Sequence, residues 1–186
     1  MLEPMHEPLL DLIRRHAART LDEHEAAMAA DTLRFVASEP DCLLRSNVQG
    51  HLTGSAWIVD SARRRTLLTH HLKLEKWLQL GGHADGDGDL LAVALREGTE
   101  ESGLTRLRVV STGIFDVDRH WIPARKTEAA HWHYDLRFML EANPDEPLVR
   151  AQNESKELAW VPLSDVTRLN SEESMARMVR KTIALV

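Results

Sequence analysis

The sequence predicts an α/β or α+β sandwich with a mixed β-sheet, preceded by an N-terminal helical arm. Three observations support this class: apolar residues recur at helical spacing near the N-terminus, strand patterns follow in the middle, and helices and strands do not alternate strictly. The 186 residues suit one domain with a modest extension. We place the extension at residues 1–48 and the domain at residues 49–186.

Composition excludes several classes of protein. The chain has 23 Lys and Arg residues against 29 Asp and Glu, a formal charge of −6, which argues against partners such as nucleic acid or an anionic membrane. No apolar run is long enough for a membrane span, and the acidic start shows no secretion pattern. Cys42 is the only cysteine, so no internal disulfide is expected and a reducing, cytoplasmic location is predicted.

Residues 9–35 are expected to be helical, because their apolar positions recur at roughly helical spacing. Residues 20–23 are interpreted as a break that begins a second helix, with Thr20 as its cap and Glu23 three residues later. Residues 39–41 contain a proline and end the helical region. This arm would suit a cap over the domain or a homodimer contact.

The middle of the chain carries apolar and β-branched runs separated by turn residues. The expected strands cover residues 51–59, 66–69, 107–111, 114–118, 132–141 and 157–161. Residues 81–89, rich in glycine and aspartate, are predicted to form a loop. A last helix is expected at residues 171–184.

The most informative segment is the helix expected at residues 90–102, which Gly103 would end. At about 100° per residue, Glu97, Glu100 and Glu101 share one narrow stripe. Like charges at this spacing repel by roughly a few tenths of a kcal/mol per pair. A divalent ion such as Mg²⁺ would offset the repulsion, because it prefers oxygen ligands. A solvated acidic helix face is the alternative.

The other side of this helix is predicted to face a core. Its residues are Leu91, Ala92, Leu95, Gly98 and Thr99. Gly98 costs about 1 kcal/mol relative to alanine within a helix, and close packing against a strand is the expected compensation.

The segment from Gly82 to Leu104 resembles the signature of the Nudix hydrolase superfamily. That signature is a glycine, five residues, a glutamate, seven residues, Arg-Glu, an apolar residue, any residue, Glu-Glu, any residue, glycine and an apolar residue. The matching residues are Gly82, Arg96, Glu97, Glu100, Glu101, Gly103 and Leu104. Gly88 replaces the early glutamate, so that either Asp87 or Asp89 beside it substitutes with a shorter reach or the role is absent. Gly98 replaces the first apolar residue.

The resemblance implies an α/β/α sandwich and a hydrolase, dependent on Mg²⁺ or Mn²⁺, that cleaves a diphosphate bond in a nucleoside diphosphate linked to another moiety. Glu97 and Glu101 would bind the metal, and Glu100 would bind metal or help to activate water. Arg96 would orient a glutamate, and the Gly82 carbonyl would be a further ligand.

A later glutamate also resembles a family feature, a loop glutamate that precedes a strand and supplies a metal ligand or the general base. Glu154 is the first candidate for this role, and Glu157 is the second. An ordinary exposed loop glutamate is the alternative interpretation.

Substrate-binding candidates lie on the strand expected near residues 131–140. Its alternation places His131, His133, Asp135 and Arg137 on one face. Such a row suggests a cleft wall in which His133 or Arg137 contacts phosphate, while a zinc site or a plain polar outer face are the alternatives. Trp121 would stack on a base, and His83 lies within the signature loop.

Two other functions stay open. Gly88 favours a non-catalytic nucleotide-binding or regulatory domain of the same family, whereas the three glutamates of the signature argue against it. A diphosphate isomerase on this scaffold would need a cysteine in its site, and Cys42 precedes the first expected strand. Residues 119–121 hold neither the proline of the ADP-ribose group nor the tyrosine of the dinucleoside group, so the predicted substrate is a nucleoside diphosphate derivative without further definition.

Overall fold

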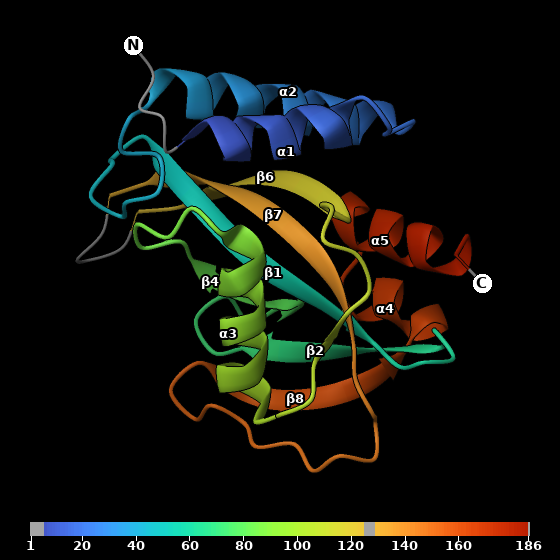
Figure 1. Cartoon of the computed structure of the whole chain (residues 1–186). Helices are drawn as coiled ribbons and strands as arrows, with labels where there is room; N and C mark the ends of the chain where they lie inside the picture. The colour runs from blue at the N-terminus through green and yellow to red at the C-terminus, as the bar shows by residue number, and fades with distance from the viewer. Residues whose placement is uncertain (1–5, 125–128, 186) are drawn as a thin grey trace. The chain divides into compact units, whose positions relative to one another are not determined.

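The computed structural model describes residues 6–124 and 129–185 (Figure 1). The chain divides into two compact units, each made of three segments. The first unit comprises Met1–Ser55, Gly82–Val93 and Thr112–Phe138. The second unit comprises Ala56–Gly81, Ala94–Ser111 and Met139–Val186.

Helices and strands intermingle along the described residues. The helices are α1 (Glu7–Ala17), α2 (Glu23–Ser38), α3 (Leu90–Ser102), α4 (Leu163–Leu169) and α5 (Glu173–Ile183). The strands are β1 (Gly50–Val59), β2 (Arg65–His71), β3 (Trp77–Leu78), β4 (Leu80–His83), β5 (Arg108–Val109), β6 (Asp116–Ile122), β7 (His131–Glu141) and β8 (Ser155–Pro162).

These strands form one mixed sheet in which β3, β2, β1, β7 and β5 are successive neighbours. In addition, β4 pairs with β1, β6 pairs with β7 and β8 pairs with β2. The predicted fold class, a mixed sheet with helices and an N-terminal helical arm, is therefore confirmed. None of the helices described is long and apolar enough to cross a lipid bilayer.

Several elements differ from the sequence-based expectation: the strand expected at residues 107–111 is only the two residues of β5, and the strand expected at residues 114–118 begins and ends later, as β6. The predicted loop at residues 81–89 begins with β4, because pairing with β1 overrides the weak strand propensity of its glycines. β3 has only two residues and α4 only seven, so neither is long enough to show a periodic pattern.

The N-terminal arm packs as a helical pair within the first unit (Figure 1), where α1 contacts α2 and α2 contacts β6. The break between the two helices is confirmed, but the prediction that Thr20 caps α2 is wrong. Asp22 is the N-cap, and its carboxylate accepts a hydrogen bond from the Glu25 N–H at 2.9 Å. The Thr20 hydroxyl instead donates to the Glu25 carboxylate at 2.7 Å.

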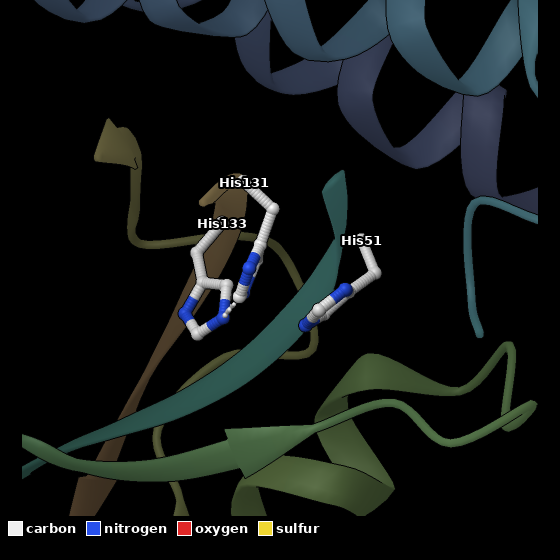
Figure 2. A group of neighbouring side chains, drawn as sticks. All are labelled: His51, His131 and His133. Carbon is white, nitrogen blue, oxygen red and sulfur yellow. Dashed lines mark hydrogen bonds between the residues drawn. The ribbon is translucent and has the colours of Figure 1, made fainter. Parts of the chain in front are cut away.

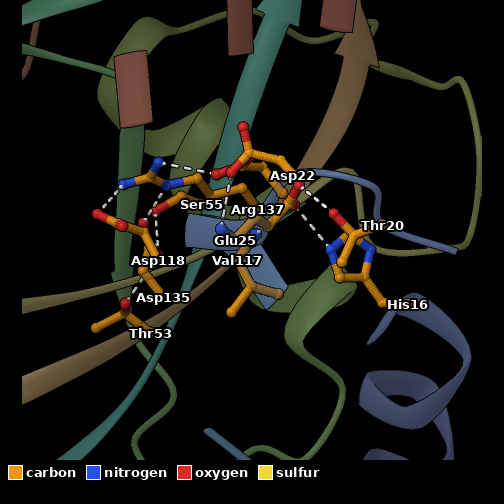
Figure 3. A network of polar contacts seen from close by, with 11 residues as sticks. His16, Thr20, Asp22, Glu25, Thr53, Ser55, Val117, Asp118, Asp135 and Arg137 are labelled. Atoms are coloured by element: carbon orange, nitrogen blue, oxygen red, sulfur yellow. Dashed lines mark hydrogen bonds and ion pairs between the residues drawn. The ribbon is translucent and has the colours of Figure 1, made fainter. Parts of the chain in front are cut away.

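Glu25 anchors this arm to the sheet of the first unit (Figure 3). Its buried Oε1 lies 2.8 Å from His16 Nε2 and accepts the Val117 N–H of β6 at 3.2 Å. His16 in turn contacts the Ile114 carbonyl through Nδ1 at 3.1 Å. A buried carboxylate is tolerated here because several donors solvate it.

Cys42, the single thiol of the chain, is fully buried just after this arm. Its N–H donates to the Glu39 carbonyl at 3.1 Å, and its own carbonyl accepts the Leu52 N–H at 2.8 Å. Burial raises the pKa of the Cys42 thiol to about 11, so the reactive thiolate is scarce at neutral pH.

The second unit is built on the antiparallel pairing of β2 with β8, which runs from Arg65 opposite Pro162 to His71 opposite Ser155. Trp57 of β1 is fully buried in this unit, and its indole N–H donates to the Thr182 hydroxyl of α5 at 2.8 Å. A buried tryptophan is thereby satisfied at its only polar atom.

Asp60 holds the turn between β1 and β2 in the second unit. Its Oδ1 accepts the N–H groups of Arg64 and Arg65 at 2.8 and 3.0 Å, and the Arg65 Nε donates to Oδ2 at 3.3 Å. Burial raises the pKa of Asp60, but these donors together outweigh burial and hold the pKa below its ordinary value.

We expect Asp60→Asn to lower the free energy of unfolding by about 1–3 kcal/mol at pH 7, because two part-buried N–H groups and the Arg65 side chain lose an ionised acceptor. The loss should shrink near pH 3. A carboxylate with a lowered folded pKa contributes stability above its unfolded pKa, and this contribution disappears as the pH falls through the folded value. Urea unfolding of the parent and the variant at pH 7 and pH 3 measures the loss of unfolding free energy. An equal loss at the two pH values would contradict the prediction.

Candidate active site

α3 is bounded by local signals that the sequence already shows. At its start the Asp89 carboxylate accepts the Ala92 N–H at 3.0 Å. At its end Gly103 adopts a left-handed φ of 72°, and its N–H donates to the Thr99 carbonyl at 2.8 Å. The predicted helix and its glycine stop are confirmed.

Gly98 lets α3 pack closely within the second unit. A Cβ atom at this position would lie 3.1 Å from Leu107 Cδ1 and 3.4 Å from Ala56 Cβ of β1, so the expected packing of this glycine against a strand is confirmed. Thr99 is exposed, and its predicted place toward the core is wrong. The buried side chains near this end are instead those of Glu101 and Ser102.

The three glutamates of the helix differ in exposure. Glu101 is only 6% exposed, Glu97 is half-buried and Glu100 is exposed. Burial and then the charge of Glu154 raise the pKa of Glu101 to about 8, and Glu97 and Glu100 add to this rise. The opposing contribution is the Gly81 N–H, which donates to Glu101 Oε1 at 3.5 Å.

Glu97 is the second carboxylate whose charge is disfavoured in this group. Burial raises its pKa, and the charges of Glu100 and Glu154 act in the same direction. Arg96 opposes them, since its Nη2 donates to Glu97 Oε1 at 3.0 Å. Arg96 is therefore placed to orient Glu97.

Glu154 lies in the exposed turn before β8 and belongs to the same unit as these glutamates. Its carbonyl accepts the Leu72 N–H at 2.7 Å, which holds the turn in place. The charge of Glu154 acts to raise the pKa of both Glu97 and Glu101, which groups it electrostatically with them. Glu157, the second candidate, is exposed on β8 opposite His70.

Four carboxylates thus gather within the second unit, and one of them is buried. Hard divalent cations such as Mg²⁺ bind through carboxylate oxygens, and positive charge would offset both the burial and the repulsion that raise the pKa of Glu101. We call Glu97, Glu100, Glu101 and Glu154 the glutamate cluster.

The loop before α3 carries the remaining signature residues. Gly82 lies in β4 and follows Gly81 directly in the chain. Asp87 and Asp89 shape this loop: Asp87 accepts the Asp89 N–H at 2.9 Å, and Asp89 caps α3. Their substitution for the early glutamate stays a prediction. Gly88 between them is exposed.

Three of the four residues on the polar face of β7, His131, Asp135 and Arg137, are buried in the first unit, so a plain polar outer face is the wrong interpretation. Figure 3 shows Asp135 and Arg137 within a polar network. Arg137 is 3% exposed and donates to three carboxylates. These are Asp135 at 2.8 Å, Asp116 at 3.1 Å and Asp118 at 3.3 Å. Asp135 also accepts the hydroxyls of Thr53 and Ser55 at 2.8 and 2.7 Å. The phosphate contact of Arg137 stays a prediction, and it would compete with these ion pairs.

Histidines crowd the start of the same strand, where His131 and His133 lie beside His51 of β1 (Figure 2). His83 lies against the rings of His51 and His133. Burial, with smaller effects from nearby positive groups, lowers the pKa of His83 to about 4 and moves the pKa of His133 far below its ordinary value. Sequence reasoning missed His51, since nothing local shows which strand β1 pairs with.

Trp121, the predicted base-stacking residue, is 50% exposed at the end of β6. Its ring meets that of Trp132 edge to face, with centroids 5.0 Å apart. The guanidinium of Arg119 lies 4.3 Å from the centroid of the Trp132 ring. Aromatic surface is thus available to a planar ligand, and base stacking stays a prediction.

Comparison with known proteins gives one family. The family model of the NUDIX domain matches residues 51–182 of the chain. A search of curated proteins found no match to the chain. The solved structures that share the fold include the following three. A NUDIX-family hydrolase from Clostridium perfringens is 22% identical, with a TM-score of 0.55 and coverage of 73% of this chain and 98% of that one.

The second is a C. elegans Ap4A hydrolase in a binary complex, 20% identical, with a TM-score of 0.51 and coverage of 72% of this chain and 96% of that one. The third is the E. coli dihydroneopterin triphosphate pyrophosphohydrolase, 14% identical, with a TM-score of 0.54 and coverage of 73% of this chain and 96% of that one. At these identities the likeness shows the fold alone.

Proposed function

The chain belongs to the NUDIX domain family, and on this premise we propose that it is a divalent-metal-dependent pyrophosphohydrolase. Its substrate is a nucleoside diphosphate linked to another moiety. The observation that carries the proposal is the glutamate cluster, in which buried Glu101 has its pKa raised to about 8 beside three further carboxylates. A domain that only binds nucleotide has no use for such a costly arrangement.

The donor set fits a hard cation. The cluster offers carboxylate oxygens, and Arg96 and the Gly81 N–H offset only part of the raised pKa values of Glu97 and Glu101, so a bound cation would stabilise the carboxylates further. Glu97 and Glu101 would hold Mg²⁺ or Mn²⁺, and the Gly82 carbonyl is a predicted further ligand. When bound, such an ion lowers the pKa of water and neutralises charge on a diphosphate.

The residues of the chain then have separable tasks. Arg96 orients Glu97 through their 3.0 Å hydrogen bond. Glu100, which is exposed, binds metal or helps to activate the attacking water. Glu154 accepts the proton of that water, because it is exposed and already acts electrostatically on Glu97 and Glu101. Water attack on phosphorus breaks the bond to the bridging oxygen, which leaves with a phosphate group.

Substrate contacts are assigned to Trp121, His83, His133 and Arg137. Trp121 would stack on the base through its exposed ring. The other three would meet the phosphates or the second moiety.

The acidic charge of the chain and its single buried cysteine favour a small-molecule substrate in a cytoplasmic setting, rather than a nucleic acid or a membrane.

A hydrolysis screen tests the proposal. The full chain is incubated with Mg²⁺ or Mn²⁺ and nucleotide sugars, ADP-ribose, coenzyme A, dinucleoside polyphosphates, nucleoside triphosphates or dihydroneopterin triphosphate. We expect turnover of at least one compound, its loss after EDTA treatment and its return when Mg²⁺ is restored. Tight binding of a nucleotide without metal-dependent turnover would replace the hydrolase with a non-catalytic regulatory domain.

A further inference from the structure

We propose that His51, His131 and His133 form a second metal site, one for a divalent transition metal such as Zn²⁺ (Figure 2). The three residues belong to the first unit and share no residue with the glutamate cluster. Below, they are called the histidine triad.

The geometry of the triad converges on one point. One ligand nitrogen from each residue lies within 4.8 Å of the others. The two nitrogens of β7 come closest, because His131 Nε2 and His133 Nε2 are 3.0 Å apart. The His51 ring centroid lies 4.8 Å from those of both partners. Tetrahedral Zn²⁺ needs nitrogens about 3.4 Å apart, so nitrogens that now lie up to 4.8 Å apart would move closer together when the ion binds.

The tautomer of His131 is the one that a ligand requires. Its Nδ1 lies 2.7 Å from the Ala129 carbonyl, which only accepts hydrogen bonds, so Nδ1 carries the proton. The Nε2 lone pair of His131 then accepts the Nε2–H of His133 at 3.0 Å, and a bound ion would take the place of that proton between the two rings. Metal-binding histidines usually donate their other ring N–H to a carbonyl in this way, which fixes the ring and strengthens the ligand.

The backbone brings the three residues together and holds them. The Trp132 N–H donates to the Gln49 carbonyl at 3.0 Å, which joins β7 to the residue before β1. A Cβ atom on Gly50 would lie 2.5 Å from the Trp132 carbonyl, so only glycine permits this approach. His51 follows Gly50 directly and thus faces the two histidines that flank Trp132.

The donor set selects the metal. Imidazole nitrogen suits Zn²⁺, Co²⁺, Ni²⁺ and Cu²⁺, whereas Mg²⁺ prefers oxygen. Three histidines leave a fourth position for water or another ring. His83 is the candidate, with ring centroids 4.9 Å from His51 and 5.0 Å from His133. A bound ion would take the nitrogen of His133 and replace its predicted direct contact with phosphate.

Cobalt titration of the full chain tests the site. The EDTA-treated protein receives excess Mg²⁺ for the glutamate cluster and is then titrated with Co²⁺ while visible absorption is recorded. We expect one Co²⁺ per chain with the spectrum of nitrogen-ligated, four-coordinate cobalt, and its displacement by Zn²⁺. Zn²⁺ should also raise the thermal unfolding midpoint, because a ligand of the folded state stabilises it.

Substitutions assign the signal to the triad. His51→Gln, His131→Gln and His133→Gln should each weaken Co²⁺ binding at least about 10-fold, since losing even an outer-shell partner has that effect. Glu101→Gln, and His24→Gln at an exposed position of α2, should leave binding unchanged. Circular dichroism of the metal-free variants checks folding.

Three results would overturn the proposal: no Co²⁺ binding by the unsubstituted chain in excess Mg²⁺, binding that survives all three triad substitutions, or binding that Glu101→Gln abolishes. The first result is obtained with the unsubstituted chain, so it tests the proposal even if a substitution prevents folding. Because the readout is metal binding rather than turnover, failure here leaves the proposed hydrolase untouched, and the reverse also holds.

Discussion

Glu101→Gln should reduce metal-dependent turnover by about 10²- to 10⁴-fold, the largest effect of any single change in the glutamate cluster. The amide keeps the size of the side chain but removes a negative charge where a divalent cation is to be held. Glu101 is the carboxylate most buried within the cluster, so solvent cannot replace it as a ligand. Steady-state kinetics across a series of Mg²⁺ concentrations measures the loss.

The same substitution should not destabilise the metal-free protein at pH 8 to 9. A carboxyl group whose folded pKa is raised to about 8 stabilises the fold only while it is protonated, and this contribution is lost as the pH rises from the unfolded value near 4.5 toward 8. Glutamine is neutral at every pH, so the variant should unfold at a higher temperature than the parent above pH 8.

Glu173→Gln is the matched control, because Glu173 is an exposed carboxylate of the second unit that pairs with Arg180 on α5. It should alter neither turnover nor the unfolding temperature appreciably. Unchanged turnover in Glu101→Gln itself would contradict the hydrolase proposal, whereas equal losses in both variants would show a general effect of charge.

Arg137→Met should lower the free energy of unfolding by about 3–5 kcal/mol at pH 7, the largest stability effect that we expect. Burial lowers the pKa of the Arg137 guanidinium, but Asp118, Asp135 and Asp116 outweigh burial, so the group stays charged. Removing it leaves three buried carboxylates without their shared cation. Methionine keeps most of the packing volume, so the loss reports electrostatics rather than a cavity.

Acid should partly reverse this loss. Without the guanidinium the carboxylates take up protons more readily in the folded variant, so the difference from the parent narrows as the pH falls toward 4. Arg108→Met is the control, because Arg108 is exposed and its pair with Glu141 is weak. Chemical unfolding at pH 7 and pH 4 measures the free energy of unfolding of each variant. A loss of stability in Arg137→Met that does not depend on pH would contradict the electrostatic explanation.

Local signals in the sequence account for the parts of this molecule that were predicted well. Asp89 and Gly103 mark the two ends of α3 in the chain itself, and the spacing of the three glutamates follows directly from the helical repeat. Each signal lies within a few residues of the feature that it specifies, so no knowledge of distant segments is needed.

The parts that sequence reasoning missed depend on distant partners. His51 joins His131 only because β1 pairs with β7, some 80 residues further along the chain. The alternation of β7 identifies Arg137 as polar, but not as buried, since burial depends on Asp116 and Asp118 of β6. The cap of α2 was misplaced by two residues, because Thr20 and Asp22 are both good caps and only the fold selects between them.

Because Cys42 is buried, its rate of chemical modification can report how often the first unit opens. The chain has no other thiol, and this one is fully enclosed and protonated at neutral pH. A thiol-specific reagent can therefore modify it only after the region around the hydrogen bond between Leu52 and Cys42 has opened. The modification rate reports that opening in the unaltered protein, without an engineered label.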